Sequence, residues 1–126
     1  AAGKYSYMAP ECYWGSYLLS SDIFSAGVVL YRMLTGIMPW TYDFDTAGDN
    51  PDDIMTMIIR ARRVQPNKPS LYCESCSTEL DKVILNSLSI DLEYRYKNAR
   101  EFLKELLNAG NKSGLLKGTE YRKGYL

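Results

Sequence analysis

The sequence has 126 residues, which is enough for one compact domain with a single hydrophobic core. Its fifteen acidic and fifteen basic residues cancel, so no long-range field favours nucleic acid or an anionic membrane surface. The absence of histidine excludes Ser-His-Asp and Cys-His catalysis within the chain, and it excludes histidine as a metal ligand.

The chain is predicted to begin with an extended segment that is followed by a short helix. Residues 1–8 show no helical period. Pro10 suits the first turn of a helix that runs through Cys12 or Tyr13, and Gly15 is expected to end it.

A longer helix is predicted at about residues 21–35. Ser20 and Ser21 are both suitable N-caps, and Gly36 suits the C-cap. Apolar residues occur on every side of this segment, which is typical of a helix that is buried all round. We therefore expect the other helices to pack around it.

A third helix is predicted after a long loop at residues 37–50. Asn50 suits its N-cap and Pro51 its first position, and together they are a strong start signal. Its last turn carries three cations that suit the helix dipole: Arg60, Arg62 and Arg63.

Two more helices are predicted in the last third of the chain. The first follows Ser77 or Thr78, and the second begins at Asn98 and ends at Gly110. The residues after 110 are basic, interrupted by glycine and weakly periodic. The sequence thus predicts an all-α fold of about five helices around a buried central helix, with a basic C-terminal tail at 111–126.

Three motifs follow one another along the chain. They are Gly3-Lys4-Tyr5-Ser6-Tyr7-Met8-Ala9-Pro10-Glu11, then Asp22-Ile23-Phe24-Ser25-Ala26-Gly27 with Pro39-Trp40 further on, and then Asp91-Leu92-Glu93-Tyr94-Arg95-Tyr96. They resemble the Ala-Pro-Glu end of the activation segment, the Asp-x-Trp-Ser-x-Gly motif and the Asp-Pro-x-x-Arg-Pro turn of eukaryotic-type, serine/threonine-like protein kinases. The resemblance covers about residues 3–108. It implies the lower half of the kinase C-lobe at 1–110, from the substrate (P+1) loop to the last helix.

The resemblance implies structural roles for four residues. Glu11 and Arg95 would form a buried ion pair, a task that suits the bidentate arginine fork. The alternative is two surface charges that never meet. Asp22 would accept hydrogen bonds from the backbone of the kinase catalytic loop, or would act simply as a first-turn acid. Gly27 would allow a neighbouring backbone to approach closely.

The same resemblance implies that Gly3, Lys4, Tyr5 and Tyr7 bind protein substrate, beneath the residue that follows the phosphorylated one. Tyr7 stands where tyrosine kinases usually carry Trp, which favours serine or threonine substrates. Lys4 replaces the Thr that serine/threonine kinases usually carry, and a lysine cannot reproduce that small donor and acceptor. The parent kinase would therefore have altered specificity, or would be weakened or inactive.

No catalytic residue, cofactor site or metal site is predicted in the chain. It lacks the Gly-rich loop, the catalytic-loop Asp and the Asp-Phe-Gly motif with which this family binds ATP and Mg²⁺. The chain alone is therefore not expected to transfer phosphate, and its role would be to bind substrate and scaffold the active site of a parent kinase. Two alternatives are a pseudokinase and a stand-alone helical interaction domain descended from a kinase.

The expected partners are a protein substrate and the N-terminal kinase portion, with self-association where apolar surface stays uncovered. No nucleic acid partner is expected, because the acidic and basic residues balance. No membrane partner is expected either, because the longest apolar stretch, 28–34, is too short to span a bilayer. The odd number of cysteines indicates a reduced, cytoplasmic protein. Cys73 and Cys76 are interpreted as incidental, because a zinc site needs a second pair or histidines.

Overall fold

The computed structural model of the protein describes residues 2–113. This part contains five α-helices, three 3₁₀ helices and no strand, so the predicted all-α fold is confirmed. The 3₁₀ helices are η1 (Ala2–Tyr7), η2 (Pro10–Trp14) and η3 (Pro69–Leu71), and the α-helices are α1 (Leu19–Thr35), α2 (Phe44–Ala47), α3 (Pro51–Ala61), α4 (Thr78–Ser87) and α5 (Ala99–Ser113). No helix within this part has the length and apolar content needed to cross a membrane.

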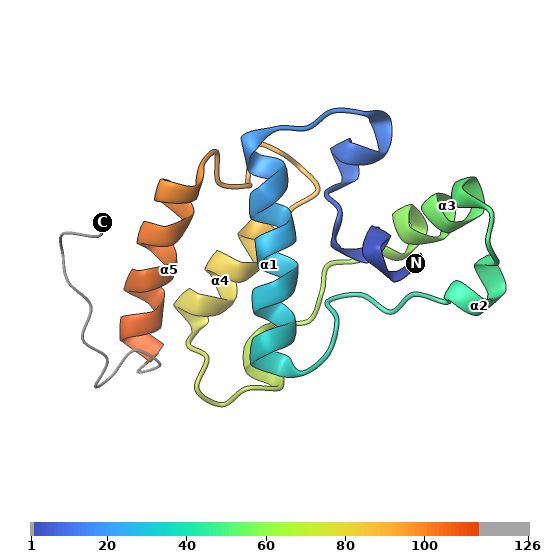
Figure 1. Cartoon of the computed structure of the whole chain (residues 1–126). Helices are drawn as coiled ribbons and strands as arrows, with labels where there is room; N and C mark the ends of the chain where they lie inside the picture. The colour runs from blue at the N-terminus through green and yellow to red at the C-terminus, as the bar shows by residue number, and fades with distance from the viewer. Residues whose placement is uncertain (1, 114–126) are drawn as a thin grey trace.

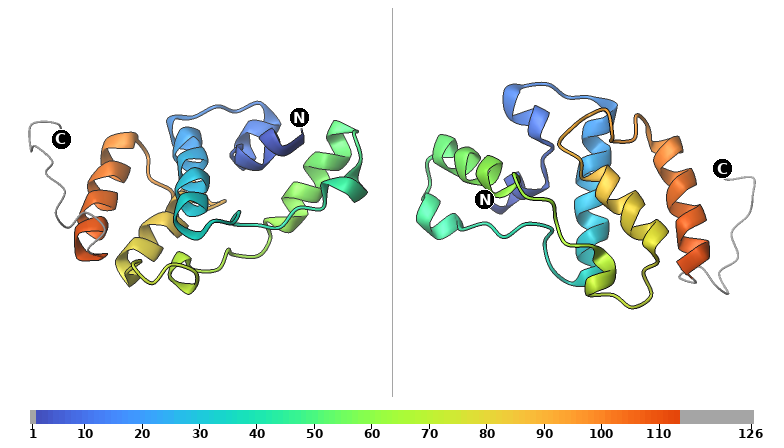
Figure 2. Two further views of the ribbon diagram at one scale, coloured as in Figure 1. Left: turned by 60° about the horizontal axis from the view of Figure 1, so that its bottom comes forward. Right: turned by 180° about the vertical axis from the view of Figure 1, so that it is seen from behind.

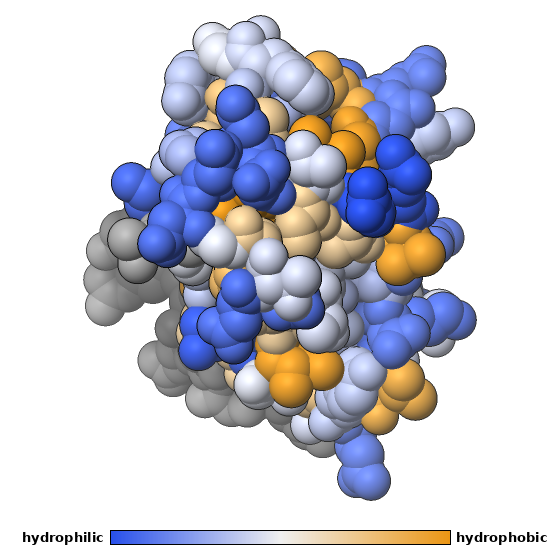
Figure 3. Space-filling view, turned by 90° about the vertical axis from the view of Figure 1, so that its right-hand side faces the viewer, coloured by the Kyte–Doolittle hydropathy of each residue, from blue (hydrophilic) through white to orange (hydrophobic). Residues whose placement is uncertain are grey.

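The helices form two groups on either side of the N-terminal segment. Helices α1, α4 and α5 lie side by side, whereas α2 and α3 lie beyond η1 on the opposite side (Figure 1). Figure 2 shows the same arrangement from two further directions, with long connections that lead to α2 and away from α3. The molecular face on the side of α2 and α3 is mainly hydrophilic, with separate apolar spots (Figure 3). Because η1 contacts both α1 and α3, the N-terminal segment is held between the two groups.

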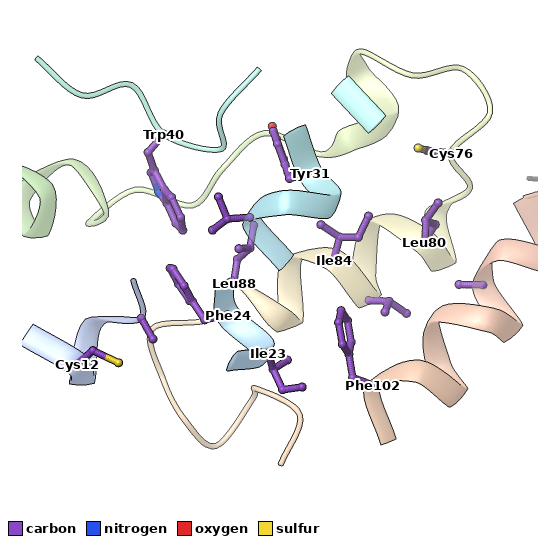
Figure 4. Close-up of a cluster of buried hydrophobic side chains, with 14 residues drawn as sticks. Cys12, Ile23, Phe24, Tyr31, Trp40, Cys76, Leu80, Ile84, Leu88 and Phe102 are labelled. Atoms are coloured by element: carbon purple, nitrogen blue, oxygen red, sulfur yellow. The ribbon is translucent and has the colours of Figure 1, made fainter. Parts of the chain in front are cut away.

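The hydrophobic core joins α1, α4 and α5. Phe24 and Val28 of α1 and Ile84 of α4 have no exposed surface, and Phe102 of α5 packs into the same cluster (Figure 4). Trp40, from the connection after α1, stacks on Phe24 with ring centroids 5.9 Å apart and planes within 9°. Burying each such side chain stabilises the fold by about 1.5–3 kcal/mol, so this shared core holds α1, α4 and α5 together.

The N-terminal residues are helical, and the prediction of an extended segment at 1–8 is wrong for the described part. Helix η1 ends at Tyr7, and the Met8 N–H donates to the Tyr5 carbonyl at 3.3 Å. The Ser6 hydroxyl donates to the Gly3 carbonyl at 2.5 Å. A 3₁₀ helix repeats every three residues, so its pattern does not match the 3.6-residue period of an α-helix.

Both glycine stops predicted in the first third of the chain are confirmed. The short helix predicted from Pro10 is η2, and it ends at Gly15 with a φ of 85°. Helix α1 ends at Gly36, whose φ is 79° and whose N–H donates to the Arg32 carbonyl at 2.8 Å. Both φ angles lie in the left-handed region, which only glycine adopts without strain.

The start of α1 differs from the prediction. The helix begins at Leu19 with Leu18 as N-cap, so Ser20 and Ser21 lie inside the first turn, where both are buried. The Ser21 hydroxyl accepts a hydrogen bond from the Leu18 N–H at 3.0 Å and donates to the Glu11 carboxylate at 2.5 Å. Ser21, at the third helical position, thus accepts the N–H of the N-cap residue Leu18, which has no partner within the helix.

Helix α1 is central as predicted, but within the described structure it is not buried on every side. Ile23, Phe24 and Val28 are at most 4% exposed, but Val29 is 46% and Met33 75% exposed. These last two residues are four positions apart and therefore share one face of the helix. This face carries uncovered apolar side chains in an otherwise central helix.

The N-caps predicted in the rest of the chain are confirmed, with Ser77 rather than Thr78 as the cap of α4. Asn50 caps α3, Ser77 caps α4 and Asn98 caps α5, each by accepting a backbone N–H at 2.9–3.1 Å from two or three residues further on. Helix α2 was not predicted and lies inside the predicted loop at 37–50. Asp43 caps it by accepting the Thr46 N–H at 3.1 Å.

Helix α5 is longer than predicted. It continues past Gly110 to Ser113, so the boundary predicted between the helical domain and the tail falls within the helix. Gly110 and Ala109 are buried, and small residues at this point allow the helix to continue against its neighbours. The rest of the predicted basic tail, 114–126, lies outside the described residues.

Candidate functional site

Glu11 and Arg95 lie 84 positions apart in the sequence and form a bidentate ion pair. The Arg95 Nη1 atom is 2.7 Å from Glu11 Oε2, and Nη2 is 3.1 Å from Oε1. The Arg95 side chain is fully buried, and the Glu11 side chain is 12% exposed. Arg95 also donates to the Ser89 carbonyl at 2.9–3.0 Å and to the Ser20 carbonyl at 3.2 Å. The pair therefore joins η2, the start of α1 and the turn before α5.

The surroundings of Glu11 favour its ionised form. Burial raises the pKa of this carboxyl, but hydrogen bonds from Arg95, Ser21 and a backbone N–H, together with the Arg95 charge, lower it below its usual value of 4.5. A buried carboxylate that is paired and multiply hydrogen-bonded remains charged at neutral pH. The Glu11–Arg95 pair therefore stays ionised across the physiological pH range.

Arg62 is a second buried arginine, and the sequence predicted for it only a favourable position near the helix dipole. It is 5% exposed and follows the last residue of α3. Its Nη2 donates to the Ser6 carbonyl at 2.9 Å, and its Nη1 donates to the Met8 carbonyl at 2.7 Å. Its Nε donates to the Tyr42 hydroxyl at 2.9 Å. Arg62 therefore reaches from the end of α3 to the N-terminal segment.

Four aromatic rings surround the Arg62 guanidinium. Its central carbon lies 4.7 Å from the ring centroid of Phe24 and 5.3–5.9 Å from the centroids of Trp40, Tyr13 and Tyr42. Burial raises the pKa of Tyr13 to about 12 and also raises the pKa of Tyr42, so both phenols stay neutral. Aromatic faces attract a cation, so these rings help to hold a charge that is out of water.

One sequence signal for the position of Arg62 exists. The two buried residues of α3 are Ile54 and Ile58, and Arg62 continues this spacing of four residues. It therefore lies on the buried face, whereas Arg60 and Arg63 are exposed on other sides. The position of each arginine around the helix therefore separates the buried Arg62 from the exposed Arg60 and Arg63. The helix dipole favours all three equally and cannot separate them.

The four residues predicted to bind substrate lie in or next to one short turn. Gly3 and Lys4 are exposed, and the Lys4 ammonium lies 5.4 Å from the centroid of the Tyr5 ring. The Tyr5 carbonyl accepts a hydrogen bond from the Tyr13 hydroxyl. The Tyr7 hydroxyl accepts from Arg32 Nη1 at 2.7 Å, so this residue is linked to the last turn of α1.

Gly27 marks a close contact between α1 and α4. A Cβ atom at this position would lie 2.1 Å from Ser87 Oγ and 3.2 Å from Leu88 Cδ2. The prediction that Gly27 admits a neighbouring backbone is therefore corrected, because the group that approaches it is the side chain of Ser87. A larger residue would push α4 away from α1.

A comparison with family models assigns the chain. The model described as the protein kinase domain matches residues 1–111. The chain belongs to the protein kinase family. The match includes η1, η2 and the α1–α5 core, and therefore both buried arginines.

Curated relatives of this kinase chain are serine/threonine kinases. It is 34% identical to serine/threonine-protein kinase PknB of Mycobacterium tuberculosis over 110 residues, which are 86% of this chain and 16% of the relative. It is 37% identical to the probable serine/threonine-protein kinase CA_C1728 of Clostridium acetobutylicum over 110 residues, again 86% of this chain and 15% of the relative. The chain spans about one sixth of the length of these relatives.

Asp22 is exposed in the first turn of α1 of this kinase chain. The structure thus brings together Glu11 with Arg95 and Gly27 with Ser87, while Asp22 stays at the surface. Its predicted contact with a catalytic loop remains a prediction.

The two cysteines of the Cys-x-x-Cys sequence lie close together between η3 and α4 of the kinase chain. The Cys76 N–H donates to the Cys73 carbonyl at 3.1 Å. Burial, followed by the hydrogen bond with Cys73, raises the pKa of Cys76 to about 12, so its thiolate is disfavoured. Among residues 2–113, no three or more His, Cys, Asp and Glu side chains gather in an arrangement that could hold a metal ion.

Proposed function

We propose that this chain is the substrate-binding and scaffold portion of a kinase that transfers the γ-phosphate of ATP to Ser or Thr of protein substrates. The observation that carries the proposal is the fixation of residues 3–11, which we call the substrate loop, between two buried arginines. Arg62 binds two carbonyls in the middle of this loop, and Arg95 binds Glu11 at its end. A substrate platform must be held in place before the substrate arrives, because ordering it on binding would cost affinity.

Within this proposal, Gly3, Lys4, Tyr5 and Tyr7 form the floor beneath the substrate residue that follows the phosphoacceptor. Gly3 and Lys4 are exposed and are therefore available to a peptide. The Tyr7 carbonyl accepts from the Ser25 hydroxyl at 2.7 Å, which connects the floor to α1. The peptide would thus rest on a surface supported by the central helix.

The residues that hold ATP and Mg²⁺ would come from another part of the parent protein. ATP would supply the phosphoryl group, and Mg²⁺ would balance its charge. The motifs that bind them in this family are absent from the present sequence, so no step of phosphate transfer is assigned to its residues. This chain would position the protein substrate and support the active site of the parent kinase.

The exposed apolar face of α1 fits a scaffold role. Val29 and Met33 are 46% and 75% exposed, and uncovered apolar side chains on a central helix favour contact with another surface. We propose that the N-terminal kinase portion covers this face, and that a chain without that portion self-associates through it. We also propose a cytoplasmic location for the parent kinase.

A phosphotransfer assay tests the proposed function. The kinase that contains this chain is incubated with ATP, Mg²⁺ and either casein or a poly(Glu-Tyr) polymer. We expect phosphate on serine or threonine of casein and none on the tyrosine polymer. The 126-residue chain alone should transfer no phosphate and should show no ATP-dependent rise in melting temperature. Phosphotyrosine as the main product, or saturable ATP binding by the chain alone, would contradict the proposal.

Lys4 favours a second candidate, a pseudokinase scaffold. It stands where serine/threonine kinases usually carry a Thr, and its exposed ammonium lies over the Tyr5 ring. A lysine at this position offers three donors and no acceptor. If Lys4 alone inactivates the protein, Lys4→Thr should produce phosphotransfer to casein where the parent protein shows none.

A further inference from the structure

We propose that Arg62 is a positioning residue that sets the shape of the substrate loop, and thereby the affinity for protein substrate. This inference rests on the proposed function for its effect on substrate. Its structural part, the fixation of the loop by one guanidinium, stands on the contacts alone. None of the three kinase-like motifs contains Arg62.

Three successive carbonyls of the substrate loop are held by side chains. Arg62 Nη2 donates to the carbonyl of Ser6, and Arg62 Nη1 donates to the carbonyl of Met8. Between them, the carbonyl of Tyr7 accepts from the hydroxyl of Ser25. Fixing three consecutive peptide groups leaves this part of the loop little freedom, and Tyr7 lies at its centre.

Only a guanidinium has the geometry for this task. Its donors are arranged in a planar fork, so two nitrogens reach two carbonyls while the third reaches the Tyr42 hydroxyl. Lysine keeps the charge, but its donors all lie on one nitrogen. Arg62→Lys therefore separates the loss of the fork from the loss of the charge.

The loop and the buried charge depend on each other. Within residues 2–113 the only ion pair joins Arg95 and Glu11, so Arg62 has no carboxylate partner there. Its charge is balanced by carbonyl dipoles and by the four surrounding rings. A charged group out of water is costly unless hydrogen-bonded, so movement of the loop away from Arg62 is disfavoured.

Arg62 also links the loop to the second group of helices. It follows the last residue of α3, and its Nε donates to Tyr42, which precedes α2. A displacement of α3 would therefore move the Ser6 and Met8 carbonyls through a single side chain. By this route, the position of α3 would affect the substrate floor.

Hydrogen exchange followed by mass spectrometry tests the structural part in the full 126-residue chain. In Arg62→Lys, we expect exchange in peptides from residues 3–9 to rise by about tenfold or more, since each lost bond involves a charged donor. Peptides from α4 and α5 should exchange as in the unchanged chain. The neighbouring exposed residue gives a matched control, and Arg63→Gln should leave all peptides unchanged.

The functional part is tested in the kinase that contains this chain, with casein as substrate. We expect Arg62→Lys to raise KM for casein at least about fivefold while kcat changes by less than about twofold, because uniform binding is lost. If Arg62→Lys does not fold, Tyr42→Phe removes only the Nε partner and should show the same local pattern at smaller size.

The outcomes separate the two proposals. Unchanged exchange at residues 3–9, or a rise spread evenly over the chain, would overturn the role of Arg62 whatever the enzyme does. A local rise in exchange with KM unchanged would overturn its effect on substrate. If the unchanged kinase transfers no phosphate to casein, the proposed function fails, and the exchange pattern still decides whether Arg62 fixes the loop.

Discussion

The two buried arginines hold the same loop in different ways. Arg95 meets a carboxylate, with two nitrogen–oxygen distances of 2.7 and 3.1 Å to Glu11. Arg62 meets carbonyl oxygens, a phenol and four aromatic rings, and no carboxylate within the described residues. Both guanidinium groups lie over the same ring, that of Phe24, at 5.2 and 4.7 Å from its centroid.

The difference concerns what remains when each arginine is removed. Without Arg95, the Glu11 carboxylate stays in a site that is mostly out of water, with only Ser21 and backbone donors. Without Arg62, neutral carbonyls lose their donors, which costs less than an unpaired charge. We infer that Arg95 chiefly stabilises the fold and that Arg62 chiefly shapes the loop.

The largest effect is expected from Arg95→Met. It leaves a buried carboxylate without its cation and should lower the free energy of unfolding by about 3–5 kcal/mol. Urea denaturation of the 126-residue chain measures this. The double variant Glu11→Gln with Arg95→Met should recover part of the loss, because the uncompensated charge is gone. A single variant as stable as the unchanged chain would contradict the buried pair.

A smaller loss is expected from Arg62→Met. Three hydrogen bonds disappear, but no charge is left unpaired, so the cost should be about 1–3 kcal/mol. The same urea titration measures it, with Arg60→Gln as an exposed control that should change stability by less than about 0.5 kcal/mol. A loss equal to that of Arg95→Met would remove the distinction between the two arginines.

Of the two arginine sites, only the one around Arg95 should respond to acid, because only this site contains a carboxylate. The folded pKa of Glu11 is lowered, so its ionised form contributes stability above the usual carboxyl pKa, and this is lost as pH falls through the folded pKa. As pH falls below about 5, Glu11→Gln should therefore lose less stability than the unchanged chain. Arg62→Met should lose as much stability on acidification as the unchanged chain does. Thermal melts from about pH 7 down to about pH 3 compare them.

The smallest effect is expected from Tyr42→Phe. It removes one acceptor of Arg62 and keeps the ring, so the cost should be about 0.5–1.5 kcal/mol. The melting temperature of this variant should lie between those of the unchanged chain and Arg62→Met. A larger loss than in Arg62→Met would show that Tyr42 acts through contacts other than this arginine.

Much of the fold is local enough to be predicted from the sequence, and so is one of the two arginines. The caps at Asn50, Ser77 and Asn98 depend only on residues within three positions, and all three were predicted. Arg95 lies in a motif, so its resemblance to the kinase pattern pointed to Glu11. Arg62 lies in no motif, and its contacts with residues more than 50 positions away follow from packing alone.

The errors in the prediction also concern features that local sequence patterns do not determine. The exposed face of α1 at Val29 and Met33 cannot be distinguished by composition from the buried face at Phe24 and Val28, because both are apolar. The first helix was missed because its 3₁₀ repeat lacks the α-helical period. Local signals thus located the helix ends well, but the burial of each face depends on which elements cover it.

Nuclear magnetic resonance of the arginine side chains tests the comparison most directly. In the 126-residue chain, the Nε–Hε groups of Arg62 and Arg95 are both buried and hydrogen-bonded, to Tyr42 and to Ser89. We predict two slowly exchanging arginine Nε–Hε signals at neutral pH, one lost in Arg62→Lys and the other in Arg95→Lys. A single slow signal, lost only in Arg95→Lys, would place Arg62 at the surface and contradict the account.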